Sequence, residues 1–260
     1  MWTARQYKSA AALVSIVVLA LTATGCGQND EQPDTAATTT PTDRLAALDG
    51  CVSASDATLL RFPGSEGEIS AAVFGDGHVG VVVSNTAIGR VCDWLPWGKD
   101  LASDGYRVML FDYSALMPTT NIPAAVDTFA KDTVQAAVKL RELGAQQVVL
   151  IGGSAGGLAA LNAASDDRAG ADGVVCLSAA GVADVPESVG QLDVPVLFVA
   201  ARDDFPAYRL ADALNSAATR AATRKLVVVD GALHADNLLQ PTAPTKQQVE
   251  SEILAFLEAL

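Results

Sequence analysis

Short apolar runs alternate with longer amphipathic segments along the chain from residue 58 onward. Apolar runs rich in valine, isoleucine and leucine are typical of buried strands, and the amphipathic segments are typical of surface helices. The pattern predicts strands over residues 58–62, 68–74, 79–84, 106–111, 147–151, 173–177, 196–200 and 225–229. It predicts helices over residues 94–103, 123–143, 154–164, 205–218 and 246–260.

This alternation predicts an α/β fold with a sheet of about eight strands. Because strands and helices alternate in the later part, we expect a mostly parallel sheet with helices on both faces. The Asp76-Gly77 pair between the second and third strands predicts a hairpin turn there, with an antiparallel edge at the start of the sheet. The connection between Ser178 and Pro195 is short, so we expect no large cap over the sheet.

The first 25 residues have the pattern of a bacterial export signal. Arg5 and Lys8 precede an apolar stretch over residues 10–24, which is short for a membrane span. The following Ala23-Thr24-Gly25-Cys26 resembles the lipobox of lipoproteins, although that family usually has leucine where Ala23 stands. The resemblance implies a lipid on Cys26 that anchors the chain to the membrane. The alternative is an ordinary secretory signal with Cys26 incidental, and both place the mature protein outside the cytoplasm.

A polar segment separates this signal from the folded part. Residues 28–42 are rich in Thr, Ala, Pro, Asp and Gln and show no apolar period, which indicates a flexible tether. We therefore expect a signal peptide over residues 1–25, a lipidated cysteine with its tether over residues 26–50, and one domain over residues 51–260.

Composition and the positions of the cysteines limit which binding partners, disulfides and metal sites we expect. Half of the 260 residues are apolar and the net charge is −13, which disfavours nucleic acid as a partner. Export permits disulfides, and Cys51 and Cys92 lie in predicted loops, which favours their pairing over three free thiols. Cys176 lies within an apolar run, which predicts a buried thiol in the core. No Cys or His spacing indicates a metal site, and no motif indicates a cofactor.

The strongest chemical signal is Gly152-Gly153-Ser154-Ala155-Gly156, which matches G-x-S-x-G. A predicted strand precedes Ser154 directly and a helix of small residues follows it, as a sharp turn that presents a nucleophilic serine requires. A phosphate-binding glycine turn is the alternative, but neither the dinucleotide nor the P-loop pattern occurs here. Ser154 is thus the candidate nucleophile.

A serine nucleophile needs a base, and the chain has only two histidines. His78 lies far upstream of Ser154, whereas His234 follows the last predicted strand. In the nucleophile-elbow fold the order along the chain is serine, acid, histidine, which only His234 satisfies. The alternative role for His234 is a solvent-exposed loop residue.

Two carboxylates compete for the role of the acid. Asp203 and Asp204 both follow the strand over residues 196–200. One of them should orient His234, and the other could cap the helix over residues 205–218. We favour Asp203 as the acid because Asp204 is better placed to cap.

The order Ser154, Asp203, His234 in these contexts resembles the α/β-hydrolase superfamily. The segment Ala201-Arg202-Asp203-Asp204-Phe205 is similar to the acid loop of its dienelactone-hydrolase-like branch. The resemblance covers nearly the whole mature chain and implies an acyl-enzyme on Ser154. It also implies an oxyanion hole built from the backbone amides of Ala155 and Thr86, although many members have His-Gly in the second segment.

These observations favour an extracytoplasmic hydrolase of small carboxylic esters. An acyltransferase would use the same triad, because only the acceptor differs. A lipid-anchored binding protein with a hydrolase fold and no turnover is the remaining alternative, and the unusual oxyanion segment is its best support.

Overall fold

The computed structural model describes residues 48, 50–52, 54–115, 122–181 and 186–260. The predicted signal peptide, Cys26 and the tether up to residue 47 lie outside the described residues. Within these ranges, no helix has the length and apolar character needed to cross a membrane.

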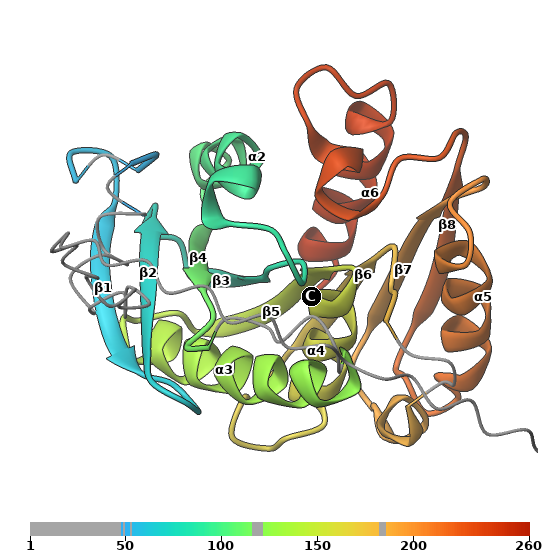
Figure 1. Ribbon diagram of the computed structural model, residues 1–260, viewed down its shortest axis with the longest axis horizontal. Coiled ribbons are helices and arrows are strands. Elements are labelled where there is room, and N and C mark those ends of the chain that lie inside the picture. Colours follow the sequence, from blue (N-terminus) through green and yellow to red (C-terminus); the bar gives the residue numbers. More distant parts are fainter. Residues whose placement is uncertain (1–47, 49, 53, 116–121, 182–185) are drawn as a thin grey trace, which may run out of the picture. The chain divides into compact units, whose positions relative to one another are not determined.

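One sheet of eight strands forms the centre of the domain, in the order β1-β2-β4-β3-β5-β6-β7-β8 (Figure 1). β1 pairs antiparallel with β2, β2 pairs antiparallel with β4, and all other pairs are parallel. The strands are β1 (Thr58–Pro63), β2 (Glu68–Phe74), β3 (Val79–Ser84), β4 (Arg107–Asp112), β5 (Gln147–Gly153), β6 (Gly173–Leu177), β7 (Val196–Ala201) and β8 (Arg224–Val229). The predicted α/β fold with a mostly parallel sheet is confirmed.

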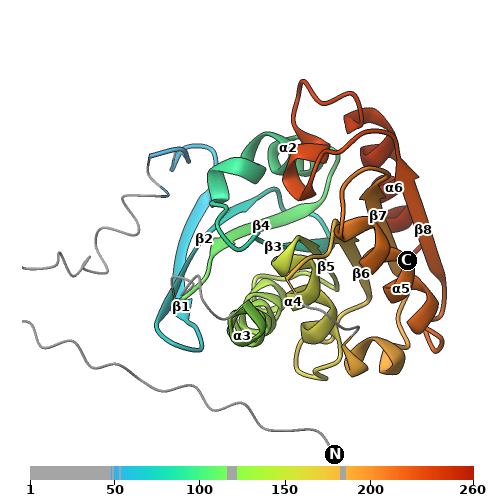
Figure 2. The same cartoon turned by 45° about the vertical axis from the view of Figure 1, so that its right-hand side comes forward.

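Helices cover both faces of this sheet, as Figure 2 shows. α2 (Val91–Ser103) and α6 (Lys246–Glu258) pack on one face, together with the short 3-10 helix η2 (Ala235–Leu239). α3 (Ile122–Glu142), α4 (Ala155–Ala164), α5 (Ala207–Ala217) and the 3-10 helix η1 (Glu187–Gln191) pack on the other face. Only η1 and its flanks fill the described part of the connection between β6 and β7, and no large cap is present there.

The central strands are apolar on both faces because both faces are covered. Along β5, Val148 and Leu150 belong to the core beneath α3 and α4, whereas Val149 and Ile151 belong to the core beneath α2 and α6. This explains the continuous apolar run in the sequence. It also places the carboxyl ends of β3, β5, β6 and β7 at the same edge of the sheet.

The predicted hairpin between the second and third strands is wrong. β2 pairs with β1 and β4, while β3 pairs with β4 and β5. The segment between β2 and β3 instead passes the turn that leads into β4, where Gly77 packs against the backbone of Gly105. The glycines therefore permit a close crossing just before the start of β4, and Asp76-Gly77 does not fold the chain back on itself.

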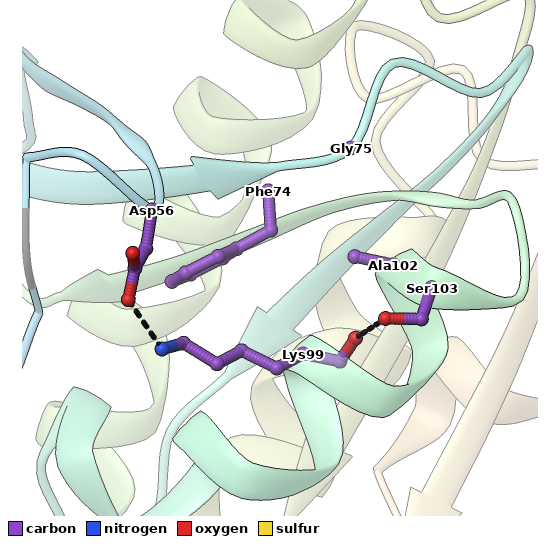
Figure 3. Close-up of a pocket in the computed structure, with 6 residues that line it drawn as sticks. All are labelled: Asp56, Phe74, Gly75, Lys99, Ala102 and Ser103. Atoms are coloured by element: carbon purple, nitrogen blue, oxygen red, sulfur yellow. Dashed lines mark hydrogen bonds and ion pairs between the residues drawn. The ribbon is translucent and has the colours of Figure 1, made fainter.

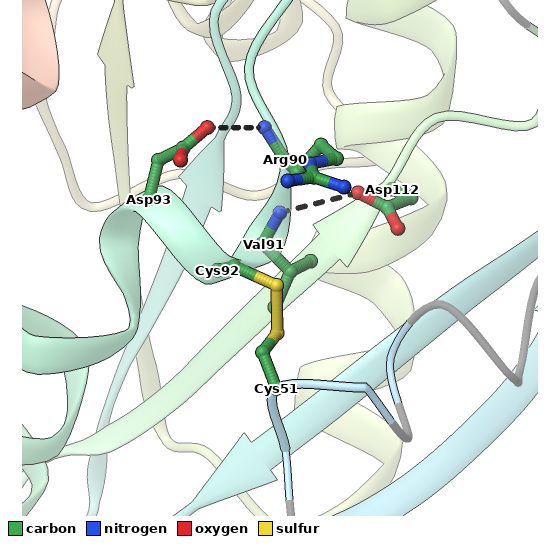
Figure 4. Close-up of a disulfide and its surroundings, with 6 residues drawn as sticks. All are labelled: Cys51, Arg90, Val91, Cys92, Asp93 and Asp112. Atoms are coloured by element: carbon green, nitrogen blue, oxygen red, sulfur yellow. Dashed lines mark hydrogen bonds between the residues drawn. A yellow bond between two sulfur atoms is a disulfide. The ribbon is translucent and has the colours of Figure 1, made fainter.

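A disulfide joins Cys51 to Cys92 in the first turn of α2, which is the pairing favoured by the sequence (Figure 4). Next to it, the amide of Val91 donates to Asp112 Oδ1 at 3.3 Å, so the start of α2 is also held to the end of β4. Cys176 is free and buried, and this burial raises the pKa of its thiol to about 12. The thiol is therefore a core group without thiolate character at neutral pH.

Candidate active site

Ser154 stands at the sharp turn between β5 and α4. Its backbone has φ 56° and ψ −125°, a conformation that non-glycine residues rarely adopt. The turn is held to the next strand because the amide of Ser154 donates to the carbonyl of Leu177 at 2.9 Å. The amides of Gly157 and Leu158 turn back to the carbonyl of Ser154, which begins α4. A strained serine at the head of a helix is the geometry of a nucleophile elbow.

Two glycines make this turn possible because backbone approaches backbone on either side of Ser154. A Cβ at Gly152 would collide with the carbonyl oxygen of Gly156. A Cβ at Gly156 would collide with the carbonyl oxygens of Ser84 and Asn85, which lie at the end of β3. The glycines of the sequence motif thus permit contact between the elbow and the loop after β3.

His234 meets an acid, and that acid is Asp204 rather than the favoured Asp203. His234 Nδ1 lies 2.8 Å from Asp204 Oδ2, and the Asp204 side chain is only 11% exposed. The amide of Asp204 donates to the carbonyl of Ala201 at 3.1 Å, which closes a tight turn with Asp203 in its middle. Asp203 therefore faces solvent, whereas Asp204, the last residue of the turn, returns to the sheet edge.

The capping role that the sequence suggested for Asp204 is also wrong. α5 begins at Ala207 after Pro206, and no side chain caps its first turn. The helix starts two residues later than predicted, so Asp204 is free to face His234.

The loop that carries His234 lies against the elbow. An ideal Cβ on Gly153 would be 2.9 Å from the Cβ of Ala235, so the residue after His234 touches the residue before Ser154. Ala235 itself has φ 50°, which bends the chain sharply into η2. The loop that carries His234 therefore lies beside the turn of Ser154 at the carboxyl edge of the sheet, and Asp204 lies beside His234.

The two amides expected to form an oxyanion hole differ in their partners. The amide of Ala155, the first residue of α4, donates to no group among the described residues. The amide of Thr86 is engaged: it donates to the side-chain oxygen Oδ1 of Asn85 at 2.9 Å. The same oxygen accepts a second hydrogen bond from the indole nitrogen of buried Trp94, also at 2.9 Å.

Below this loop, Tyr113 holds the peptide that joins Asn85 to Thr86. The Tyr113 hydroxyl donates to the carbonyl of Asn85 at 2.7 Å and lies 2.8 Å from the Ser84 hydroxyl. Its ring stacks on Phe129 with 3.7 Å between ring centroids. Burial raises the pKa of Tyr113 well above its usual value, so the hydroxyl remains a proton donor.

Sequence reasoning missed the roles of Asn85 and Tyr113. A signal was available, since Asn85 directly follows the predicted strand over residues 79–84 and Tyr113 lies two residues after the predicted strand over residues 106–111, at the edge where this fold builds its sites. Trp94, in the first turn of α2, is buried and donates to Asn85 Oδ1.

Two surface hollows lie away from this edge. One, of about 370 Å³, is lined by the end of β2 and the last turns of α2, and the ion pair between Lys99 and Asp56 spans it at 2.7 Å (Figure 3). Phe74, which lines it, pairs with Val108 near the start of β4, so this hollow is at the opposite edge from Ser154. The other, of about 550 Å³, lies between α3 and the end of α4. Neither is lined by Ser154, Asp204 or His234.

The sheet order and the strained serine turn define an α/β-hydrolase fold. A family model described as the alpha/beta hydrolase fold matches residues 80–224, which is more than half of the chain. The chain therefore belongs to the α/β-hydrolase family. A comparison with curated protein sequences finds no match.

Solved structures share this fold at low sequence identity. The dienelactone hydrolase of Anabaena variabilis is 18% identical with a TM-score of 0.63, over 76% of this chain and 95% of that one. An esterase of Pyrococcus furiosus is 15% identical with a TM-score of 0.64, over 78% and 92%. Esterase 2 of Thermogutta terrifontis, solved as phosphorylated by paraoxon, is 16% identical with a TM-score of 0.62, over 77% and 93%. The expected likeness to dienelactone hydrolases is thus confirmed for the fold.

Proposed function

We propose that this protein is a serine hydrolase that cleaves carboxylic esters through an acyl-enzyme on Ser154. The observation that carries the proposal is the pair His234–Asp204 beside a serine held in a strained elbow. A histidine whose Nδ1 is bound to a carboxylate keeps its proton on that nitrogen, which leaves the other ring nitrogen free to accept one. Asp204 is therefore the orienting acid in this proposal.

The reaction begins when Ser154 Oγ attacks the ester carbonyl and passes its proton to Nε2 of His234. The new bond moves the carbonyl electron pair onto oxygen, and the amide of Ala155 and the positive end of α4 stabilise that charge. Collapse of this intermediate breaks the bond to the alcohol, which leaves with the proton from His234. A water molecule then repeats the sequence on the acyl-enzyme and releases the acid.

Labelling with a fluorophosphonate probe tests this proposal directly. We expect covalent labelling and hydrolysis of p-nitrophenyl acetate by the wild-type protein, and neither by Ser154→Ala. His234→Ala should lower kcat by about 10⁵-fold or more, because the two groups act as a unit. A folded wild-type protein that neither labels nor hydrolyses short esters would support the non-catalytic binding protein, for which the engaged Thr86 amide is the supporting observation.

An acyltransferase with the same triad differs only in its acceptor. Adding an alcohol such as methanol to the ester assay separates the two reactions. If the protein is a hydrolase, free acid remains the main product, whereas an acyltransferase would convert most of the acyl group into the new ester.

We also propose that the chain is exported and anchored through a lipid on Cys26. The Cys51–Cys92 disulfide supports an oxidising compartment outside the cytoplasm. In a bacterial host, the wild-type protein should fractionate with membranes and incorporate an alkyne-tagged fatty acid. Cys26→Ser should abolish the incorporation, and wild-type protein in the soluble extracytoplasmic fraction would favour ordinary secretion.

A further inference from the structure

We propose that the side-chain amide of Asn85, and not the backbone amide of Thr86, is the second hydrogen-bond donor of the oxyanion hole. This inference rests on the proposed hydrolase function, because it assigns a role in stabilising the charge formed by attack of Ser154. It replaces a backbone donor with a side-chain donor on the loop after β3.

The orientation of the Asn85 carboxamide is determined by its partners. Oδ1 accepts from two groups that can only donate, the amide of Thr86 and the indole nitrogen of Trp94, each at 2.9 Å. Reversing the carboxamide would place its NH₂ group against both donors. The side-chain amine Nδ2 is therefore fixed on the far side of the carboxamide.

That amine has no partner within the described protein. No described residue accepts a hydrogen bond from Asn85 Nδ2, although the residue as a whole is only 2% exposed. Nδ2 is also not among the fully enclosed polar atoms that lack a partner, which are Arg61 Nε, Ser178 Oγ and Asn215 Oδ1. The small exposed part of Asn85 thus includes a donor that faces open space.

The surroundings place this donor beside the elbow. Asn85 directly follows Ser84, which pairs with Gly152 of β5, so Asn85 is level with the residues next to Ser154. Its backbone carbonyl packs on Gly156, and the Trp94 ring that holds its side chain would lie 2.9 Å from a Cβ on Gly153. The carboxamide is therefore fixed between the loop after β3 and the turn that carries the nucleophile.

Such a donor would act with the amide of Ala155. As Ser154 Oγ bonds to the carbonyl carbon, the π pair moves to the oxygen, and Ala155 N–H and Asn85 Nδ2–H donate to it. When the intermediate collapses, the carbonyl re-forms and both hydrogen bonds weaken. Loss of one such donor commonly lowers kcat by about 10²–10³-fold.

Two substitutions separate this role from the alternatives. Asn85→Asp keeps an oxygen for Thr86 and Trp94 but replaces the donor with a charged acceptor, and we expect kcat to fall by about 10³-fold or more. Asn85→Ala removes the donor and frees the Thr86 amide, and we expect a fall of about 10²-fold with a small change in KM. Circular dichroism and the melting temperature verify folding of each variant.

A transition-state analogue gives a second readout. A trifluoromethyl ketone forms a hemiketal oxyanion on Ser154, and its inhibition constant should rise in each variant by about the same factor as kcat/KM falls. Trp94→Phe removes the indole N–H that donates to Oδ1, together with part of a buried ring, and leaves Nδ2 in place. In a variant whose melting temperature shows that it is folded, it should lower kcat by a smaller factor, about 10-fold.

Each contrary result has a distinct meaning. Activity retained in Asn85→Asp would show that only the oxygen of Asn85 matters and would overturn the inference. Higher activity in Asn85→Ala would show that Asn85 obstructs the Thr86 amide, which would overturn it as well. Wild-type turnover no greater than that of Ser154→Ala would instead overturn the proposed function, and this inference with it.

Discussion

The turn between β5 and α4 and the loop between β3 and α2 meet at the same edge of the sheet, yet they are built differently. The turn is shaped by backbone contacts, and its glycines allow carbonyl groups to approach closely. The loop is shaped by side chains, because Asn85, Trp94 and Tyr113 determine where its peptide groups point. A backbone-built turn leaves a sequence motif, whereas a side-chain network leaves only scattered polar and aromatic residues.

The two aspartates after β7 give the largest expected effect on kcat. Only the geometry of their side chains distinguishes these neighbouring residues. We expect Asp204→Asn to lower kcat by about 10³–10⁴-fold, since His234 would lose the carboxylate that orients it. Asp203→Asn is the matched control, and its exposed side chain should affect kcat by less than about threefold. Steady-state ester hydrolysis measures both, and a larger loss in Asp203→Asn would contradict the structure.

Gly156→Ala tests the backbone-built turn. The added Cβ would collide with the carbonyls of Ser84 and Asn85, so we expect a loss of about 3 kcal/mol in unfolding free energy and little remaining activity. Gly190→Ala is the control, because its Cβ would lie 3.7 Å from the nearest atom, an ordinary contact. Urea unfolding measures both variants. Equal stability of the two would show that the elbow tolerates a side chain at Gly156.

Tyr113→Phe tests the side-chain-built loop. It removes the hydrogen bond to the Asn85 carbonyl and preserves the ring that stacks on Phe129. We expect kcat to fall about 10-fold and the unfolding free energy to fall by about 1 kcal/mol. Tyr106→Phe provides a comparison at the other edge of the sheet, where the tyrosine hydroxyl bonds to no described residue. A similar fall in kcat in Tyr106→Phe would argue against a specific role for Tyr113.

Ser178 lies just after β6, and its substitution has the smallest expected effect on the unfolding free energy. Its hydroxyl is buried without a hydrogen-bond partner, and its backbone has φ 48°. Ser178→Ala should raise the unfolding free energy by about 1 kcal/mol, because it removes an unsatisfied buried group. Ser165→Ala breaks a hydroxyl bond to the Asn162 carbonyl and should have the opposite sign. Destabilisation by Ser178→Ala would reveal a partner for this hydroxyl.

The sequence predicted the strands, the helices and the sharp turn at Ser154 because all of them depend on local patterns. Apolar runs indicated the eight strands, and the glycines around Ser154 indicated the turn. The pairing of β2 was not predictable from Asp76-Gly77, because β4, which occupies the place beside β2, comes later in the chain. The partner of His234 was missed because the tight turn from Ala201 to Asp204 decides which aspartate returns to the sheet.

The disulfide between Cys51 and Cys92 restrains the loop between β3 and α2. Cys92 lies in the first turn of the helix that ends the loop of Asn85, so the bond restrains that loop at its far end, while Tyr113 restrains its near end. In the chain-entropy description, closing a loop of 41 residues stabilises the fold by about 4 kcal/mol. We expect a chain kept reduced to retain the glycine-built turn but to have a looser loop between β3 and α2. We therefore expect the oxidised chain to turn over esters faster than a chain whose disulfide has been reduced.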